Sequence, residues 1–154
     1  MRFKLVIKYI ILILWMILIF WFSNQNGTIS SEMSDGLISE VVKFIEIILK
    51  NSFGNEKNIE AFAFLIRKVA HFFLYFVLGI LWMNLLKEHR VSLGKQVIYS
   101  LLFCIMYACS DEIHQLFIPG RSGNIIDTMI DTTGSLCSII TIYLFKKYKN
   151  KAVY

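Results

Sequence analysis

Residues that interrupt helices are scarce in this sequence. Its 154 residues include one proline and eight glycines, and they show neither an internal repeat nor a low-complexity segment. The apolar stretches therefore continue unbroken, and 56% of all residues are hydrophobic. A soluble domain of this size and composition would have too little polar surface, so the composition predicts an integral membrane protein.

Paired cysteines are also missing. The three cysteines, Cys104, Cys109 and Cys137, lie inside apolar runs, and no two of them form a CxxC pair. We expect them to be small apolar side chains, which argues against a disulfide framework and a cysteine metal cluster. The sequence has no HExxH motif and no serine or cysteine beside a base in an obvious catalytic triad, so it indicates neither a zinc-protease pattern nor a covalent hydrolase.

Charged residues make up only 18% of the chain, and their distribution is uneven. The net charge of +5 arises from lysines and arginines that gather at the ends of apolar runs. Basic residues in such positions anchor helices against lipid headgroups. The placement therefore argues against nucleic acid as a partner, although the net charge alone would allow it.

Four transmembrane spans are predicted, at residues 5–22, 69–87, 97–117 and 124–145. The apolar part of the third ends at Cys109 and is too short to cross alone, so this helix has to carry the polar residues 111–115 within the outer leaflet. Basic residues precede the first run, separate the second from the third and follow the fourth, so the positive-inside rule places both termini in the cytoplasm. No small-x-small cleavage site follows the first run, which is therefore expected to be a retained span. We predict one domain over residues 1–154, an all-α bundle of four transmembrane helices.

The segment between the first two runs has a different pattern. Residues 37–49 place apolar side chains at helical spacing, with Ser39, Glu40, Lys43 and Glu46 between them. This period predicts an extracytoplasmic amphipathic helix that lies on the outer leaflet or caps the bundle.

Ionisable residues concentrate between residues 110 and 134, with apolar runs on both sides. Charges flanked in this way are costly, because the hydrocarbon core does not solvate them. The alternating direction of the spans brings this stretch to the outer leaflet, together with the start of the second run at Arg67, Lys68 and His71. The sequence thus predicts one polar cluster at a single membrane depth.

Three kinds of chemistry fit such a cluster, and the sequence leaves all three open. The charges could form salt bridges that fix the order of the helices. They could hold a divalent cation through carboxylates and either His71 or His114, the candidate metal set being Asp111, His114, Asp127 and Asp131. They could instead form an acid/base core, since one of several crowded carboxylates can hold a proton near neutral pH. The candidate catalytic residues are Asp111, Glu112, His114, Asp127 and Asp131, while Arg67, Lys68 and Arg121 could hold a lipid phosphate.

The order and spacing of several short motifs resemble the VanZ-like family of bacterial membrane proteins. The matching pieces are Phe22-Ser23-Asn24-Gln25, Arg67-Lys68-Val69-Ala70-His71-Phe72 with Tyr75 and Leu78-Gly79, and Asp111-Glu112-Ile113-His114-Gln115 through Pro119-Gly120-Arg121 to Asp127, Asp131 and Gly134. One departure is Leu74, where many members carry glutamate. The resemblance implies candidate substrate-binding side chains at Ser23, Gln25, Arg67, Lys68, His71, Tyr75, Gln115 and Arg121.

The resemblance also implies a compartment, the bacterial cytoplasmic membrane, and a phenotype. The family's founding member lowers susceptibility to the lipoglycopeptide teicoplanin, so we expect a cell-envelope role against teicoplanin-type lipoglycopeptides or related stress. The expected partner is a membrane lipid, a lipid-linked envelope precursor or the lipoglycopeptide itself, bound or modified in the polar cluster. The alternative is a non-enzymatic scaffold whose buried charges only fix helix packing. No cofactor is indicated beyond the candidate divalent cation, and the oligomeric state is left open.

Overall fold

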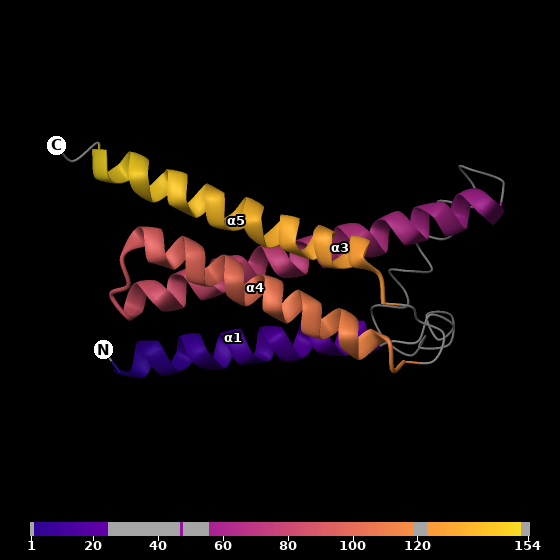
Figure 1. Cartoon of the computed structure of the whole chain (residues 1–154), viewed down its shortest axis with the longest axis horizontal. Helices are drawn as coiled ribbons and strands as arrows, with labels where there is room; N and C mark the ends of the chain where they lie inside the picture. Colours follow the sequence, from indigo (N-terminus) through magenta and orange to yellow (C-terminus); the bar gives the residue numbers. More distant parts are fainter. Residues whose placement is uncertain (1, 25–46, 48–55, 119–122, 152–154) are drawn as a thin grey trace.

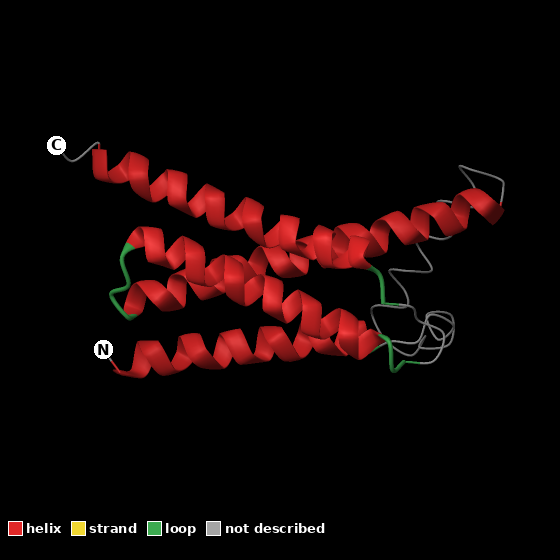
Figure 2. Cartoon of the chain, in the orientation of Figure 1, coloured by secondary structure: helices red, strands yellow, loops and turns green. Residues whose placement is uncertain are grey.

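The computed structural model describes residues 2–24, 47, 56–118 and 123–151. In these residues the regular structure is entirely helical: α1 spans Arg2–Ser23, α3 spans Glu56–Glu88, α4 spans Leu93–Gln115 and α5 spans Ile125–Lys151 (Figure 2). Helices suit a bilayer because each one satisfies its internal backbone groups within its own segment. The scarcity of proline and glycine allows these apolar runs to stay continuous.

Each of these helices contains a segment that is long and apolar enough to cross a membrane: Phe3–Ser23, Lys68–Glu88, Leu93–Gln115 and Ile125–Lys149. The predicted all-α class with four transmembrane helices is therefore confirmed for the described part of the chain. Helix α3 is longer than its span, because its 33 residues rise about 50 Å. The predicted amphipathic helix at residues 37–49 lies, apart from residue 47, outside the described residues.

The four helices alternate in direction along the bundle (Figure 1). The beginning of α1, the turn between α3 and α4 and the end of α5 lie at one end of the molecule. The last turns of α1 and α4 and the first turn of α5 lie at the other end. This arrangement brings together polar residues that are far apart in the sequence.

Small residues let α3 and α5 approach closely, and these two helices share the most extensive packing. A Cβ atom added at Gly134 would collide with the backbone of Phe72. One added at Gly79 would collide with Ser138 and lie 3.0 Å from the Ser135 carbonyl oxygen. Because lipid is as apolar as a side-chain core, close backbone packing of this kind is a main source of helix association in a bilayer.

Helix α1 is attached to the bundle by polar contacts as well as by packing. The Trp15 indole Nε1 donates to the Leu74 carbonyl oxygen at 2.9 Å. The Tyr107 hydroxyl donates to the Met16 carbonyl oxygen at 2.7 Å. Most of the large apolar side chains of α1 are exposed, which fits a helix that faces lipid on its outer side.

At the end of the bundle that holds the beginning of α1, exposed side chains join α1 to α3. Lys8 Nζ lies 2.5 Å from Glu88 Oε1, and the Tyr9 hydroxyl lies 2.7 Å from His89 Nε2. Both members of the Lys8–Glu88 pair are about one-third exposed, so water and salt screen their attraction.

We expect Glu88→Gln to leave the melting temperature of the purified protein nearly unchanged. Exposed ion pairs between long side chains contribute little to stability, because ordering the side chains offsets the weak attraction. Differential scanning fluorimetry in a mild detergent measures the effect. A large drop in melting temperature would show instead that this pair holds α1 against α3.

Candidate functional site

Hydrogen bonds at the polar end of the bundle close α4 and begin α5. The N–H groups of residues 116–118 donate to the carbonyl oxygens of residues 113–115 and form a turn. The helix therefore ends at Gln115, earlier than the predicted residue 117, because this turn has the tighter hydrogen-bonding pattern that often closes helices. Asn124 caps α5 by accepting the Ile126 N–H at 3.0 Å. The Asn124 N–H donates to Glu112 Oε2 at 2.7 Å, so Glu112 ties the end of α4 to the start of α5.

Three ionisable side chains from three helices meet inside this end of the bundle. His71 comes from α3, Asp111 from α4 and Asp131 from α5, and one ligand atom of each lies within 4.8 Å of the others. His71 Nδ1 lies 3.5 Å from Asp131 Oδ1. Asp111 is 3% exposed and Asp131 is fully buried, so the two carboxylates are almost entirely removed from solvent. We call His71, Asp111 and Asp131 the His/Asp cluster.

Tyr75 lies beside the His/Asp cluster, one turn after His71 on α3. The residue is fully buried and interacts electrostatically with both Asp111 and Asp131. Its hydroxyl has no hydrogen-bond partner among the described residues. Burying a hydroxyl without a hydrogen bond costs free energy. The described residues therefore leave polar groups of this site without partners.

An ion pair flanks the His/Asp cluster. Lys68 Nζ donates to Asp127 Oδ1, which joins the first membrane turn of α3 to the first turn of α5. The Lys68 side chain is 10% exposed and the Asp127 side chain is 21% exposed. The pair is thus shielded from water far better than the Lys8–Glu88 pair at the opposite end of the bundle.

The end of α1 is linked to the end of α4 by a second group of polar contacts. Gln115 Nε2 donates to the Ser23 hydroxyl at 2.6 Å, and both residues are buried. His114 Nε2 lies 3.3 Å from Asn24 Oδ1, and its ring lies against Phe20 with centroids 4.4 Å apart. His114 therefore faces α1 rather than the His/Asp cluster.

Comparison with known protein families finds that the VanZ/LLP1 model matches residues 8–146. This chain belongs to the VanZ/LLP1 family. The match covers most of the chain and extends over parts of all four described helices. No curated protein and no solved structure matches the chain. Membership in a VanZ-like family, predicted from the motif order, is confirmed.

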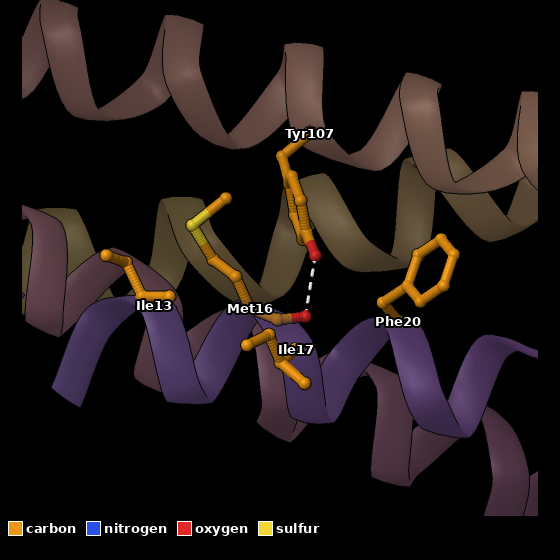
Figure 3. A pocket seen from close by; sticks show the side chains of 5 residues that line it. All are labelled: Ile13, Met16, Ile17, Phe20 and Tyr107. Carbon is orange, nitrogen blue, oxygen red and sulfur yellow. Dashed lines mark hydrogen bonds between the residues drawn. The ribbon is translucent and has the colours of Figure 1, made fainter. Parts of the chain in front are cut away.

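An apolar groove adjoins the polar site of this VanZ/LLP1 protein. It has a volume of about 280 Å³, and Figure 3 shows the side chains that line it, Ile13, Met16, Ile17 and Phe20 from α1 and Tyr107 from α4. Two of these lining residues contact residues of the polar end of the bundle. Phe20 contacts His114, and Tyr107 lies against Tyr75 with ring centroids 6.1 Å apart.

The predicted metal set of the VanZ/LLP1 chain is only partly assembled. Asp111 and Asp131 converge, whereas Asp127 pairs with Lys68 and His114 turns toward α1. His71, the other histidine that the sequence allowed as a ligand, is the third member of the group with Asp111 and Asp131. A helix rotates about 100° per residue, so His114 and Asp111 point in directions about 60° apart although they are one turn from each other.

The structure describes some of the remaining predicted site residues of this VanZ/LLP1 member and not others. Ser23 and Gln115 bond to each other, and Glu112 bonds to the α5 backbone. Gln25 and Arg121 lie outside the described residues, as does the side chain of Arg67. Two asparagines outside the set of candidate site residues, Asn24 and Asn124, also take part in the hydrogen bonds of the site. Asn24 belongs to the Phe22-Ser23-Asn24-Gln25 motif, and Asn124 stands where the sequence allows a cap for the fourth span.

Proposed function

We propose that this VanZ/LLP1 protein binds or modifies an amphiphile of the bacterial envelope in the outer leaflet, and that it thereby lowers susceptibility to teicoplanin-type lipoglycopeptides or related envelope stress. The amphiphile is a lipid, a lipid-linked precursor or the acylated drug. The observation that carries the proposal is the His/Asp cluster, which gathers two buried carboxylates and an imidazole from three helices next to an apolar groove.

The cost of this arrangement supports a functional role. Helix packing alone would be satisfied by apolar or small polar side chains, whereas ionisable groups inside a membrane bundle are expensive and usually functional. The cluster could hold a polar headgroup, and the groove between α1 and α4 could hold an acyl chain. Because the groove-lining residues Phe20 and Tyr107 contact His114 and Tyr75, an acyl chain in the groove would lie beside the polar site.

The distribution of basic residues supports an outer-leaflet position for the site. Lysines and arginines gather at the end of the bundle formed by the start of α1, the α3–α4 turn and the end of α5. The positive-inside rule assigns that end to the cytoplasm, which puts both termini inside and the His/Asp cluster near the outer surface.

Teicoplanin susceptibility of a sensitive bacterial host tests the proposal. We expect the wild-type chain to raise the inhibitory concentration, and Asp111→Asn or Asp131→Asn to abolish this protection while the membrane abundance, measured by immunoblot, stays the same. Glu88→Gln removes a carboxylate at the opposite end and should protect as well as the wild type. If equally abundant aspartate variants still protect, the site has no part in the phenotype. If the wild type gives no protection from teicoplanin, the proposed phenotype is wrong.

The Lys68–Asp127 pair favours a second candidate, a non-enzymatic scaffold. This shielded pair joins α3 to α5 and has the position expected of a contact that fixes helix order. Under this alternative, loss of a site carboxylate should lower protein abundance or melting temperature together with protection. Under the proposed function, protection should disappear from a protein that remains folded.

A further inference from the structure

Three helices each bring one metal-ligating side chain to a single point in this bundle. The ligand atoms of His71, Asp111 and Asp131 lie within 4.8 Å of one another. Two ligands of one Zn²⁺ ion lie about 3.0–3.5 Å apart, since each is about 2.1 Å from the metal. The His71–Asp131 separation of 3.5 Å already has this value. Only the approach of Asp111 requires adjustment.

The unpaired polar atoms of this region are an independent indication of a ligand. Both carboxylate oxygens of Asp111 and both of Asp131 have no hydrogen-bond partner among the described residues. The same holds for His71 Nδ1 and for the fully buried Tyr75 hydroxyl. Ser23 and Gln115, which are hydrogen-bonded to each other, lie near the Asp111 carboxylate. Buried oxygens that lack donors are the groups that a cation would satisfy.

The balance of charge favours a divalent cation. Among the described side chains, Lys68 already pairs with Asp127, so the two carboxylates of the His/Asp cluster face His71 as their nearest basic group. A neutral imidazole with two carboxylates and one divalent ion has no net charge. Such a neutral unit costs much less inside a membrane than two unpaired carboxylates.

We propose that His71, Asp111 and Asp131 bind a divalent transition-metal ion of the Zn²⁺ or Mn²⁺ type, with the Tyr75 hydroxyl as a hydrogen-bonding neighbour. One imidazole and two carboxylates suit these metals, and three protein ligands leave a coordination position open. That position would take an anionic oxygen from the headgroup of the amphiphile. This use of the ion rests on the proposed function, whereas binding of the ion does not.

Metal titration of the purified full chain in a mild detergent tests the site. After treatment with EDTA and removal of the chelator, the protein is titrated with ZnCl₂ or MnCl₂, and bound metal is measured by plasma mass spectrometry. We expect about one ion per chain and a melting temperature that rises with metal. His71→Ala and Asp131→Asn should each weaken metal binding at least about tenfold, since even the loss of an outer-shell partner often has this effect.

Two matched variants control for nonspecific binding. His89→Ala and Glu88→Gln remove an imidazole and a carboxylate at the opposite end of the bundle and should bind metal as the wild type does. The proposal is overturned if the EDTA-treated wild type binds no metal, or if all four variants bind as much metal as the wild type. Should a cluster variant fail to fold, the metal-dependent rise in the wild-type melting temperature remains a test, and its absence also overturns the proposal.

Metal binding and teicoplanin protection can fail separately. If the wild type binds one ion but the aspartate variants protect as well as the wild type, the metal site exists and the proposed function is wrong. If the wild type binds no metal but Asp111→Asn abolishes its protection, the polar site functions without an ion and the metal proposal is wrong.

Discussion

Gly134→Leu is expected to lower the free energy of unfolding by about 3 kcal/mol, because it places a side chain where α3 and α5 meet. A Cβ atom at Gly134 would already collide with the backbone oxygen of Phe72, and its carbonyl carbon lies only 3.0 Å from the same position. A flexible side chain could move aside, but a helix backbone cannot do so without separating the two helices. The melting temperature in detergent and resistance to unfolding by SDS measure the loss.

Gly94→Leu is the matched control for this substitution. Gly94 lies in the first turn of α4, and a Cβ atom added there meets nothing within 4 Å. This variant should match the wild type or be more stable by up to about 1 kcal/mol, since leucine is the better helix former. If Gly134→Leu and Gly94→Leu have the same melting temperature, the close approach of α3 and α5 is not required for stability.

The second large effect is expected from Lys68→Met, which should lower the free energy of unfolding by about 3 kcal/mol. The substitution keeps an unbranched side chain but leaves the Asp127 carboxylate without its partner in a shielded position. Asp127→Asn should also be destabilising, because it leaves the Lys68 ammonium facing a neutral group. Thermal melts of the two single variants measure these costs.

The exchanged pair, Lys68→Asp with Asp127→Lys, separates attraction between the charges from other roles. If the pair acts mainly by charge attraction, the exchange should recover most of the stability that either single variant loses. Protection from teicoplanin is measured on the same proteins. A stable exchanged protein without protection would place Lys68 or Asp127 in the functional site, whereas recovery of both properties would assign the pair to helix packing. Additive destabilisation would contradict a direct attraction between the two side chains.

Much of the fold could be predicted from the sequence, because membrane spans depend on length and apolarity rather than on partners. The four apolar runs became four helices, and their alternating direction set the ends of α1 and α4 beside the start of α5. The same alternation explains why Asp111 and Asp131, which follow one another closely in sequence, lie on different helices at one depth. The helix limits were less certain, as α4 shows by closing at Gln115.

The partners within the polar site could not be predicted in the same way. Spacing gives the angle between two side chains of one helix, but it does not give the rotation of that helix relative to its neighbours. The sequence could therefore place His71 and His114 at one depth without deciding which of them meets the aspartates. It also could not pair Lys68 with Asp127 or Gln115 with Ser23.

The sequence by itself determined the membrane class, the four spans, the family and the gathering of ionisable residues at one end, because each follows from composition and order along the chain. Only the tertiary structure decided that His71 joins Asp111 and Asp131 while His114 turns to α1. That choice depends on how each helix is rotated in the bundle. Contacts such as the one between Gly134 and the Phe72 backbone fix this rotation, and they exist only once α3 and α5 have packed.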